Sequence, residues 1–294
     1  MITPSHKATV AGLTAIVLWS MSIGLIRTIS EHFGPTLGAA LIYTGSAVLL
    51  CITGGVRAGR TLPLPYLIAG GFLFVSYEIA LAIAIGLART REQAVELGMI
   101  NYLWPCLTVI LAIPFNRQRF TFWLWLGLVL CTLGLLLVMN DNLQWSPKAL
   151  WQNITENPAA YSLAFFAAFA WALYNNVTRR WAKGTSGVSL FFVITALILW
   201  VKFFFEDTAF NINFSGSALV TVTVMACSTA FAYSGWNRGM QYGSLPLLTS
   251  VSYFTPVLSA LLAAQLLGLN PSLMFWIGVV ILSMGSLLCW RSLH

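Results

Sequence analysis

The sequence predicts an all-α membrane protein of ten transmembrane helices, arranged as two inverted five-helix repeats around a central cavity. Composition, the spacing of apolar stretches and an internal repeat lead to this prediction. Of the 294 residues, 59% are hydrophobic and only 8% are charged, whereas a typical soluble domain carries about 25% charged residues. A soluble fold of this size could not cover its surface with so few charges. The composition therefore excludes an ordinary soluble enzyme, a disordered chain and a coiled coil.

Ten stretches are apolar enough to cross a hydrocarbon core about 30 Å thick, which takes about 20 helical residues. They cover residues 8–30, 35–54, 64–88, 93–114, 121–140, 159–181, 187–205, 215–241, 244–268 and 271–290. The first stretch follows two basic residues, His6 and Lys7, and in that respect imitates a signal peptide. It is too long for one and lacks a clear cleavage site, so we interpret it as the first transmembrane helix.

The distribution of basic residues predicts the orientation. Ten crossings place both termini on one side of the membrane, and ten of the fifteen Lys and Arg residues fall on that side. The positive-inside rule makes that side cytoplasmic. The net charge of +7 is not a signal for nucleic acid, because the basic residues are strung between apolar runs instead of being clustered. We expect no nucleic-acid partner.

The cysteines and histidines suggest no metal, cofactor or catalytic site. The cysteines all lie inside apolar stretches, are odd in number, and show no metal-ligand spacing; they are Cys51, Cys106, Cys131, Cys227 and Cys289. We interpret them as small apolar fillers. The histidines stand near the termini or in a short loop, which leaves none for a catalytic relay or a zinc site in the core.

The two halves of the sequence share a motif at a fixed offset. The run Asn101-Tyr102-Leu103-Trp104-Pro105 in the fourth span corresponds to Ser252-Tyr253-Phe254-Thr255-Pro256 in the ninth, and the Tyr and Pro residues of the two runs are 151 residues apart. The same offset relates Gly127 and Gly134 of the fifth span to Gly278 and Gly285 of the tenth, and Trp19 precedes Trp171 by 152 residues.

The shared offset predicts two repeats, residues 1–147 and residues 148–294. Because five spans are an odd number, the second copy enters the membrane from the opposite face, and the copies are inverted. Inverted repeats are an architecture of secondary transporters, in which two halves alternate around a central site. A duplication without a transport role is the alternative.

Glu78 is the only acidic residue well inside a predicted span. A carboxylate at this depth is costly unless it faces a wet cavity or a partner. Two roles are open. Glu78 either binds a substrate amine or exchanges protons, or it is a neutral, hydrogen-bonded side chain that joins two helices.

Aromatic and amide side chains recur at helical spacing in several spans. Trp171, Tyr174 and Asn175 follow one face of the sixth span, and a polar-aromatic face in a lipid-solvated helix must point inward. The predicted substrate-binding residues are Trp19, Tyr77, Glu78, Asn101, Tyr102, Trp104, Trp171, Tyr174, Asn175, Tyr233, Trp236, Asn237 and Tyr253. Such a lining suits an amino acid with an aromatic or apolar side chain, because rings stack and an ammonium binds a ring face. Packing between helices is the alternative for each residue.

Pro105 and Pro256 are predicted hinges. Each removes one backbone hydrogen bond from its helix and permits a bend, and they occupy equivalent positions in the two copies. A static kink is the alternative.

The chain resembles the EamA-type members of the drug/metabolite transporter superfamily. The resemblance rests on the five-plus-five arrangement, the interior Trp19 and Trp171, and the Tyr-x-x-Pro motifs of the fourth and ninth spans. Further runs that carry it are Val75-Ser76-Tyr77-Glu78-Ile79 and Ala232-Tyr233 followed by Trp236-Asn237. The resemblance implies ten helices, a place in the bacterial inner membrane with cytoplasmic termini, and efflux of amino acids or related metabolites.

We therefore expect a secondary transporter that exports amino acids, aromatic or hydrophobic ones preferred, by alternating access. Its expected partners are a small-molecule substrate and the lipid bilayer, and coupling to protons through Glu78 stays open. The chain has no Walker motif for direct use of ATP. The alternatives are an exporter of other metabolites or cationic drugs by proton exchange, a channel or scaffold, and an intramembrane enzyme. An enzyme would need paired catalytic groups within the bilayer, and the sequence offers only Glu78 there.

Overall fold

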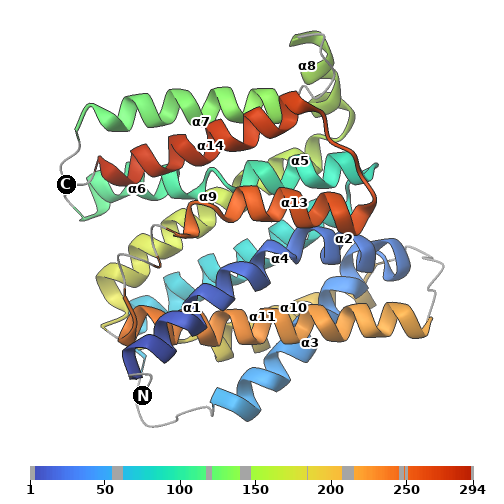
Figure 1. The fold of residues 1–294 in the computed structure, drawn as a ribbon. Coiled ribbons are helices and arrows are strands. Elements are labelled where there is room, and N and C mark those ends of the chain that lie inside the picture. The colour runs from blue at the N-terminus through green and yellow to red at the C-terminus, as the bar shows by residue number, and fades with distance from the viewer. Residues whose placement is uncertain are drawn as a thin grey trace. The chain divides into compact units, whose positions relative to one another are not determined.

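The computed structural model describes residues 4–54, 62–116, 121–139, 147–183, 185–206, 215–244, 248 and 251–292. All regular secondary structure within these residues is helical (Figure 1). The chain divides into two compact units, and each unit takes segments from both halves of the sequence. Unit 1 combines Met1–Thr61 with Ser186–Leu266, and unit 2 combines Leu62–Thr185 with Leu267–His294.

Unit 1 is a helical bundle in which α1 packs along α11, and α3 packs against both α10 and α11. Its helices are α1 (Pro4–Ser20), α2 (Ser22–Phe33), α3 (Pro35–Gly54), α10 (Val188–Phe204), α11 (Gly216–Tyr242) and α13 (Thr255–Leu267), whose last residue falls at the unit boundary. The turn between α2 and α3 needs Gly34, which has a φ of 78°, and Pro35 then begins α3.

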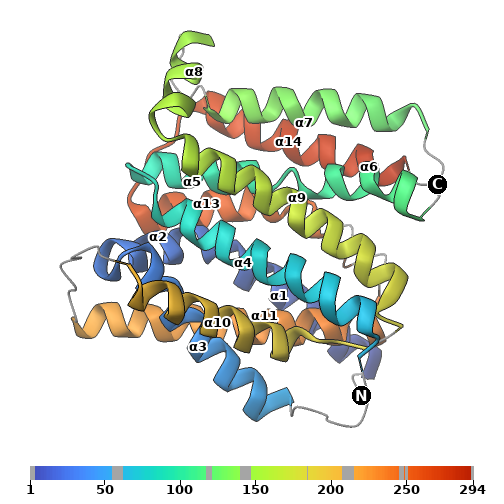
Figure 2. The same cartoon turned by 180° about the vertical axis from the view of Figure 1, so that it is seen from behind.

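Unit 2 is a second bundle, in which α7 packs along α14 and α9 packs against α4, α5 and α6. Figure 2 shows α4 beside α9. Its elements are the π-helical turn η1 (Tyr66–Gly70), α4 (Gly71–Gly86), α5 (Arg91–Asn101), α6 (Trp104–Asn116), α7 (Trp123–Met139), α8 (Pro147–Glu156), α9 (Pro158–Trp181) and α14 (Leu273–Arg291). The short helix α8 was not predicted, because it carries no apolar stretch of membrane-spanning length.

Side-chain caps fix where three helices begin. Thr90 accepts a hydrogen bond from the backbone N–H of Gln93 at the start of α5, at 3.1 Å. Ser215 does the same for α11 and Ser272 for α14. Each cap satisfies a backbone donor that has no partner within the helix.

Five helices are long and apolar enough to span a membrane within the described residues. They cover Pro35–Thr53, Tyr66–Gly86, Arg91–Phe115, Gly216–Trp236 and Leu273–Arg291. A sixth candidate is the bent pair of His6–Ser20 and Ser22–Phe33. Three shorter apolar helices, at Trp123–Val138, Val188–Phe204 and Thr255–Leu267, lie within other predicted spans, and α9 coincides with the predicted span 159–181. The count of ten spans stays a prediction.

The first predicted span is bent instead of straight. Its two helices meet at Met21 at an angle of 43°. Just before the bend, the Ser20 hydroxyl donates a hydrogen bond of 2.8 Å to the carbonyl oxygen of Ile16. Such a bond back to the preceding turn competes with the backbone ladder and often bends a helix.

In the fourth and ninth predicted spans the α-helix gives way to a two-residue turn just before the proline, although Arg91–Phe115 still counts as one apolar helix by its length. The helix stops at the turn Tyr102–Leu103, and Pro105 is the second residue of α6. A turn at Tyr253–Phe254 likewise precedes α13, in which Pro256 is the second residue. The hydrogen bonds that resume the helix also match, because Leu107 N–H donates to Leu103 and Leu258 N–H donates to Phe254, at 3.1 and 3.0 Å. The offset of the sequence motif thus reappears in the backbone.

Four glycines bring α7 and α14 into backbone contact. A Cβ atom added to Gly127 would lie 2.8 Å from the carbonyl oxygen of Gly285, and one added to Gly134 would lie 2.7 Å from that of Gly278. The order of these contacts makes the helices antiparallel. A larger residue at any of the four positions would force the backbones apart.

Candidate functional site

Five aromatic side chains meet around Trp171 in unit 2. This group, called the Trp171 cluster, consists of Tyr66, Phe74, Tyr77, Trp171 and Tyr174. The ring of Trp171 lies 4.6 Å from that of Tyr77 and 5.1 Å from that of Tyr174, centroid to centroid, and it stacks on the second. Phe74 meets Tyr174 edge to face at 5.3 Å. These separations are those of favourable aromatic pairs.

Two packed helices and one π-helical turn assemble the Trp171 cluster. Phe74 and Tyr77 are three residues apart on α4, and Trp171 and Tyr174 are three residues apart on α9, so each pair occupies one helix face. Tyr66 lies on η1, which packs against α9. Its hydroxyl oxygen lies 3.1 Å from that of Tyr174, at hydrogen-bonding distance.

The members of the Trp171 cluster differ in exposure. Tyr66, Phe74 and Tyr174 are buried, whereas Tyr77 and Trp171 are half-buried. Tyr77 and Trp171 are therefore the members of the cluster with some surface left uncovered.

Glu78 adjoins this cluster and is buried, with 5% of its surface exposed. Its carboxyl group is close enough to Tyr77 and Tyr174 to interact electrostatically with both. Glu78 also has further polar interactions within the structure, so it is not an isolated charge. Both predicted roles, in function and in joining helices, stay open.

Asn101 is the last residue of α5 and stands directly before the break at Tyr102. It is buried, with 7% exposed, and its side chain is hydrogen-bonded with Tyr77. Its Oδ1 atom has no hydrogen-bond partner among the residues that the structure describes. A buried acceptor without a partner is uncommon in a native protein. This oxygen is an unused acceptor next to the cluster, and because it is buried a ligand could reach it only after the surrounding side chains move.

A second group of rings lies in unit 1 and is called the Trp19 cluster: Trp19, Tyr233, Trp236, Phe192 and Tyr43. Trp19 on α1 lies 5.2 Å from Tyr233 and 5.4 Å from Trp236 on α11. Tyr233 also meets Phe192 on α10 at 5.0 Å, and Phe192 meets Tyr43 on α3 at 5.6 Å. Trp19 stands two residues before the bend at Met21.

The structure thus brings together three predicted residues in unit 1 and six in unit 2, counting Glu78, Asn101 and Tyr102 through their interactions with Tyr77. Tyr102 is buried and interacts electrostatically with Tyr77. Trp104, Asn175 and Tyr253 are half-buried, and Pro105 and Pro256 are buried. The side chain of Asn237 lies outside the described residues. The binding role of every one of these residues remains a prediction.

The prediction missed four ring residues, namely Tyr43, Tyr66, Phe74 and Phe192. For Phe74 the signal was available, because it stands three and four residues before Tyr77 and Glu78 on the same helix face. Tyr66 gave no such signal, because the π-helical turn breaks the α-helical spacing before α4.

The amide beside Asn175 has a structural role. Asn176 is buried and donates hydrogen bonds from its Nδ2 atom to the carbonyl oxygens of Thr108, at 3.0 Å, and Ala172, at 2.9 Å. The first of these bonds joins α9 to α6. Interhelical bonds of this kind are the alternative that the sequence analysis left open for amide residues.

The described residues contain one group of side chains that could hold a metal ion, formed by Cys106, Cys131 and Cys289. No histidine or carboxylate belongs to this group. It involves none of the predicted substrate-binding residues.

Comparisons with known proteins agree with this description. A model of the EamA-like transporter family matches the chain twice, at residues 6–140 and 158–291. The chain is 45% identical, over 286 residues and 97% of each chain, to a protein of Salmonella typhimurium (strain 14028s / SGSC 2262) named "Aromatic amino acid exporter YddG". It is also 45% identical, over 285 residues and 97% of each chain, to the protein of that name from Escherichia coli (strain K12).

More distant similarities extend over most of the chain as well. A protein of the same name from Ancylobacter novellus is 29% identical over 265 residues, which are 87% of each chain. A solved structure described only as the crystal structure of a protein matches 99% of both chains with a TM-score of 0.69 and 23% identity, which indicates a shared fold. The family consists of transporters and not of enzymes, and several helices have membrane-spanning length. This chain is a multi-pass membrane protein that belongs to the EamA-like transporter family.

Proposed function

We propose that the protein exports aromatic amino acids, with other hydrophobic amino acids as weaker substrates, by alternating access across the membrane. The two relatives at 45% identity are named as aromatic amino acid exporters, and the similarity extends over 97% of this chain. A substrate site spread over several helices is expected to persist at that level of similarity.

The observation that carries the proposal is the Trp171 cluster with the Oδ1 atom of Asn101 beside it. The ring of an aromatic amino acid would stack on Tyr77 or Trp171, and each such ring pair contributes about 0.5–1.5 kcal/mol beyond its buried area. The substrate ammonium would donate to the free oxygen of Asn101, and a ring face offers it a further cation–π contact. A hydrogen bond to a charged group contributes about 1.5–3 kcal/mol.

Residues 1–147 and 148–294 are proposed as inverted repeats that enclose this site. Two matches to the family model, one in each half, support the proposal. The antiparallel glycine contacts between α7 and α14, one helix from each half, also support it. In this scheme Pro105 and Pro256 are the hinges, and the remaining predicted residues line the central cavity from both halves.

We place the protein in the bacterial inner membrane with both termini in the cytoplasm. The excess of basic residues on the side of the termini supports the orientation. Contact with lipid is supported by large apolar side chains that are exposed along several helices, such as Ile52, Phe72 and Val220, at 75%, 67% and 62%. A cysteine appended to the C-terminus of a cysteine-free variant should resist a membrane-impermeant maleimide in intact cells. Labelling from outside would contradict the orientation.

The central test is flux in proteoliposomes. Purified protein is reconstituted, loaded with unlabelled amino acid, and assayed for uptake of labelled phenylalanine, tyrosine, tryptophan, leucine, glycine and lysine by exchange. We expect the three aromatic amino acids to exchange fastest, leucine more slowly, and glycine and lysine at the rate of empty liposomes. Equal rates for all six amino acids, or no exchange of any, would contradict the proposed substrate.

Proton exchange is a second candidate mechanism, because Glu78 is buried next to the cluster. The same vesicles with an imposed pH gradient distinguish it from facilitated export. If protons are coupled through Glu78, the gradient should drive accumulation by the wild-type protein but not by Glu78→Gln. An equal response of both proteins to the gradient would exclude this role for Glu78.

A further inference from the structure

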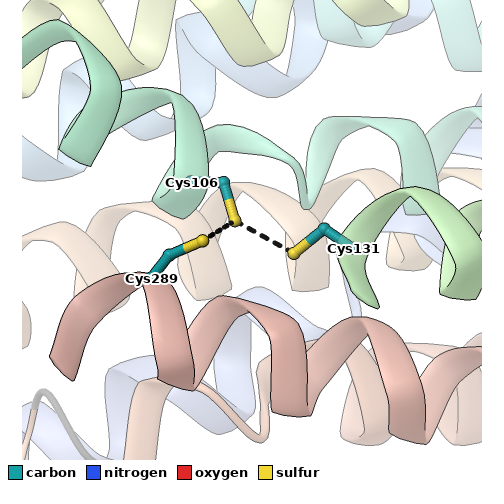
Figure 3. Close-up of side chains that lie close together, drawn as sticks. All are labelled: Cys106, Cys131 and Cys289. Atoms are coloured by element: carbon teal, nitrogen blue, oxygen red, sulfur yellow. Dashed lines mark hydrogen bonds between the residues drawn. The ribbon is translucent and has the colours of Figure 1, made fainter. Parts of the chain in front are cut away.

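Three cysteines that are far apart in the sequence meet inside unit 2. Cys106 of α6, Cys131 of α7 and Cys289 of α14 point toward one another (Figure 3). The Sγ atom of Cys106 lies 2.9 Å from that of Cys131 and 2.7 Å from that of Cys289. All three sulfur atoms lie within 4.8 Å of one another, and all three residues are at least 98% buried.

The local packing is shaped around these thiols. A Cβ atom on Gly127 would lie 2.6 Å from the sulfur of Cys289, and one on Gly285 would lie 2.8 Å from the sulfur of Cys131. The two glycines that bring α7 and α14 together therefore also leave the space that the sulfur atoms occupy. Any other residue at these positions would collide with the thiols.

Helix packing by itself does not call for cysteine at these positions. The offset of 151 assigns the equivalents Val257, Leu282 and Val138 to Cys106, Cys131 and Cys289, respectively. Aliphatic side chains thus occupy the equivalent positions in the other copy. Because hydrocarbon side chains fill the equivalent positions of the other copy, three thiols in one place indicate a role that depends on sulfur.

We propose that Cys106, Cys131 and Cys289 bind a soft monovalent metal ion of the d¹⁰ class, with Cu(I) as the biological ion and Ag(I) as its analogue. Thiolate ligands select Cu(I), zinc and iron–sulfur clusters. Structural zinc takes four ligands and the common iron–sulfur clusters are held by four cysteines, and no fourth histidine, cysteine or carboxylate joins this group within the described residues. Cu(I) is satisfied by two or three sulfur ligands.

The geometry fits a three-sulfur site after a small adjustment. Three sulfurs at about 2.3 Å from a common ion stand about 4 Å apart. The two short Sγ–Sγ separations would lengthen by roughly 1 Å. Small rotations of the cysteine side chains within their preferred rotamers are sufficient for this change. Cys106 lies between the other two, so its removal should weaken metal binding most.

Charge balance favours a monovalent ion. The thiolate is the form that binds metal, but a buried charge without compensation is costly. A Cu(I) ion that displaces one thiol proton leaves the group neutral. Binding should therefore release about one proton per ion.

The site lies close to one end of the α7–α14 pair. Cys289 stands three residues before Ser292, whose carbonyl oxygen accepts a 3.1 Å hydrogen bond from the backbone N–H of Thr121, just before α7. An ion would therefore have about one helical turn to travel from that end. Cys106 directly follows Pro105, so a bound ion would tie the beginning of α6 to the α7–α14 pair. An effect on export through this tie depends on the proposed function, whereas the site does not.

The test is a competition for Cu(I) with the full-length protein in detergent, fully reduced and without oxygen. The protein is titrated into Cu(I) bicinchoninate, whose absorbance falls as the ion leaves the dye. We expect one Cu(I) per chain for the wild type, and X-ray absorption should show sulfur neighbours only. Cys106→Val, which imitates Val257 and should fold, is expected to lose the ion. Cys51→Ala and Cys227→Ala, which alter half-buried cysteines on α3 and α11 of unit 1, should keep it.

Three results would overturn the proposal. One is no Cu(I) uptake by the reduced wild type. Another is equal uptake by Cys106→Val. The third is a stable disulfide within the group, seen as a mass two hydrogens lighter that persists in reductant. Amino acid exchange is measured on the same preparations, so that a failure of the proposed substrate and a failure of the metal site are seen separately.

Discussion

Gly127 and Gly285 stand in reciprocal contact where α7 crosses α14, because a Cβ atom on either one would lie 2.8 Å from the carbonyl oxygen of the other. Gly134 and Gly278 show the same reciprocity at 2.7 Å. By the offset in the sequence, Gly127 is the equivalent of Gly278, and Gly134 is the equivalent of Gly285. Gly127 therefore contacts the equivalent of Gly134, and Gly134 contacts the equivalent of Gly127. Reciprocal contacts of this kind are those of two copies related by a two-fold axis.

A methyl group at this crossing should destabilise the protein. In Gly134→Ala the new Cβ would collide with the backbone nitrogen of Leu282, so the helices must separate. Overpacking of this kind costs about 1–3 kcal/mol, which should lower the melting temperature in detergent by several degrees. Gly216→Ala is the matched control, because no atom lies within 4 Å of the added Cβ. Equal melting temperatures for the two variants would contradict the close approach.

Removing the central ring of the Trp171 cluster should impair export of aromatic amino acids. Trp171→Ala deletes the ring contacts with Tyr77 and Tyr174, and we expect initial rates of phenylalanine exchange to fall at least tenfold, with Trp171→Phe in between. Trp151→Ala alters a tryptophan of α8 that is 68% exposed and should exchange normally. Normal exchange by Trp171→Ala would remove the cluster from the transport path.

The free oxygen of Asn101 should contribute mainly to substrate affinity. Asn101→Leu keeps the size of the side chain but removes the acceptor, and the half-saturating concentration of phenylalanine should rise about tenfold or more. Concentration dependence of exchange in proteoliposomes measures this. The comparison is Asn153→Leu, which changes an amide of the short helix α8. An unchanged half-saturating concentration in Asn101→Leu would show that the oxygen does not meet the substrate.

The end of α10 should show a dependence of stability on pH. Lys202 donates hydrogen bonds from Nζ to Glu206, at 2.7 Å, and to Thr36 of α3, at 3.0 Å. Burial raises the pKa of Glu206, but hydrogen bonds with Lys202 and Thr36 and the charge of Lys202 outweigh it, so the pKa lies below its usual value. The carboxylate therefore stabilises the fold above about pH 4.3, and this contribution is lost as the pH falls through the lowered pKa.

Glu206→Gln tests this relation. The variant should melt slightly below the wild type at pH 7, because an ion pair near the surface contributes less than about 1 kcal/mol, and the difference should shrink as the pH falls below about 4.3. Lys202→Met should remove this dependence of the difference on pH. A difference in melting temperature that stays constant as the pH falls would assign the effect to packing instead of charge.

The sequence contained the information for most of the helices. Long apolar runs predicted where they lie, and Pro105 and Pro256 indicated where two of them are interrupted. It did not contain the bend at Met21, because the hydrogen bond of Ser20 to the preceding turn has a counterpart at Ser46 in α3, which is not broken there. The helix α8 was missed because it is neither apolar nor long.

The candidate sites were predicted to different degrees. Spacing of three and four residues was sufficient to place Trp171 and Tyr174 on one face. The pairing of that face with Tyr77 depends on how α4 packs against α9, which periodicity within one helix cannot supply. The cysteine group was not foreseen, because Cys106 and Cys289 are 183 residues apart in the sequence and only the fold makes them neighbours.

The interruption before Pro105 leaves α6 with 13 residues, and the one before Pro256 leaves α13 with 13. At 1.5 Å per residue each of these rods is only about 20 Å long, shorter than the hydrocarbon thickness of about 30 Å. Their first turns therefore begin inside the hydrocarbon layer, where lipid offers no hydrogen bond to a peptide group. At each stop the amides of Tyr102, Leu103 and Phe254 still donate to carbonyl oxygens three residues earlier, at 3.0 Å, so the chain tightens into a turn there without leaving these donors to the lipid.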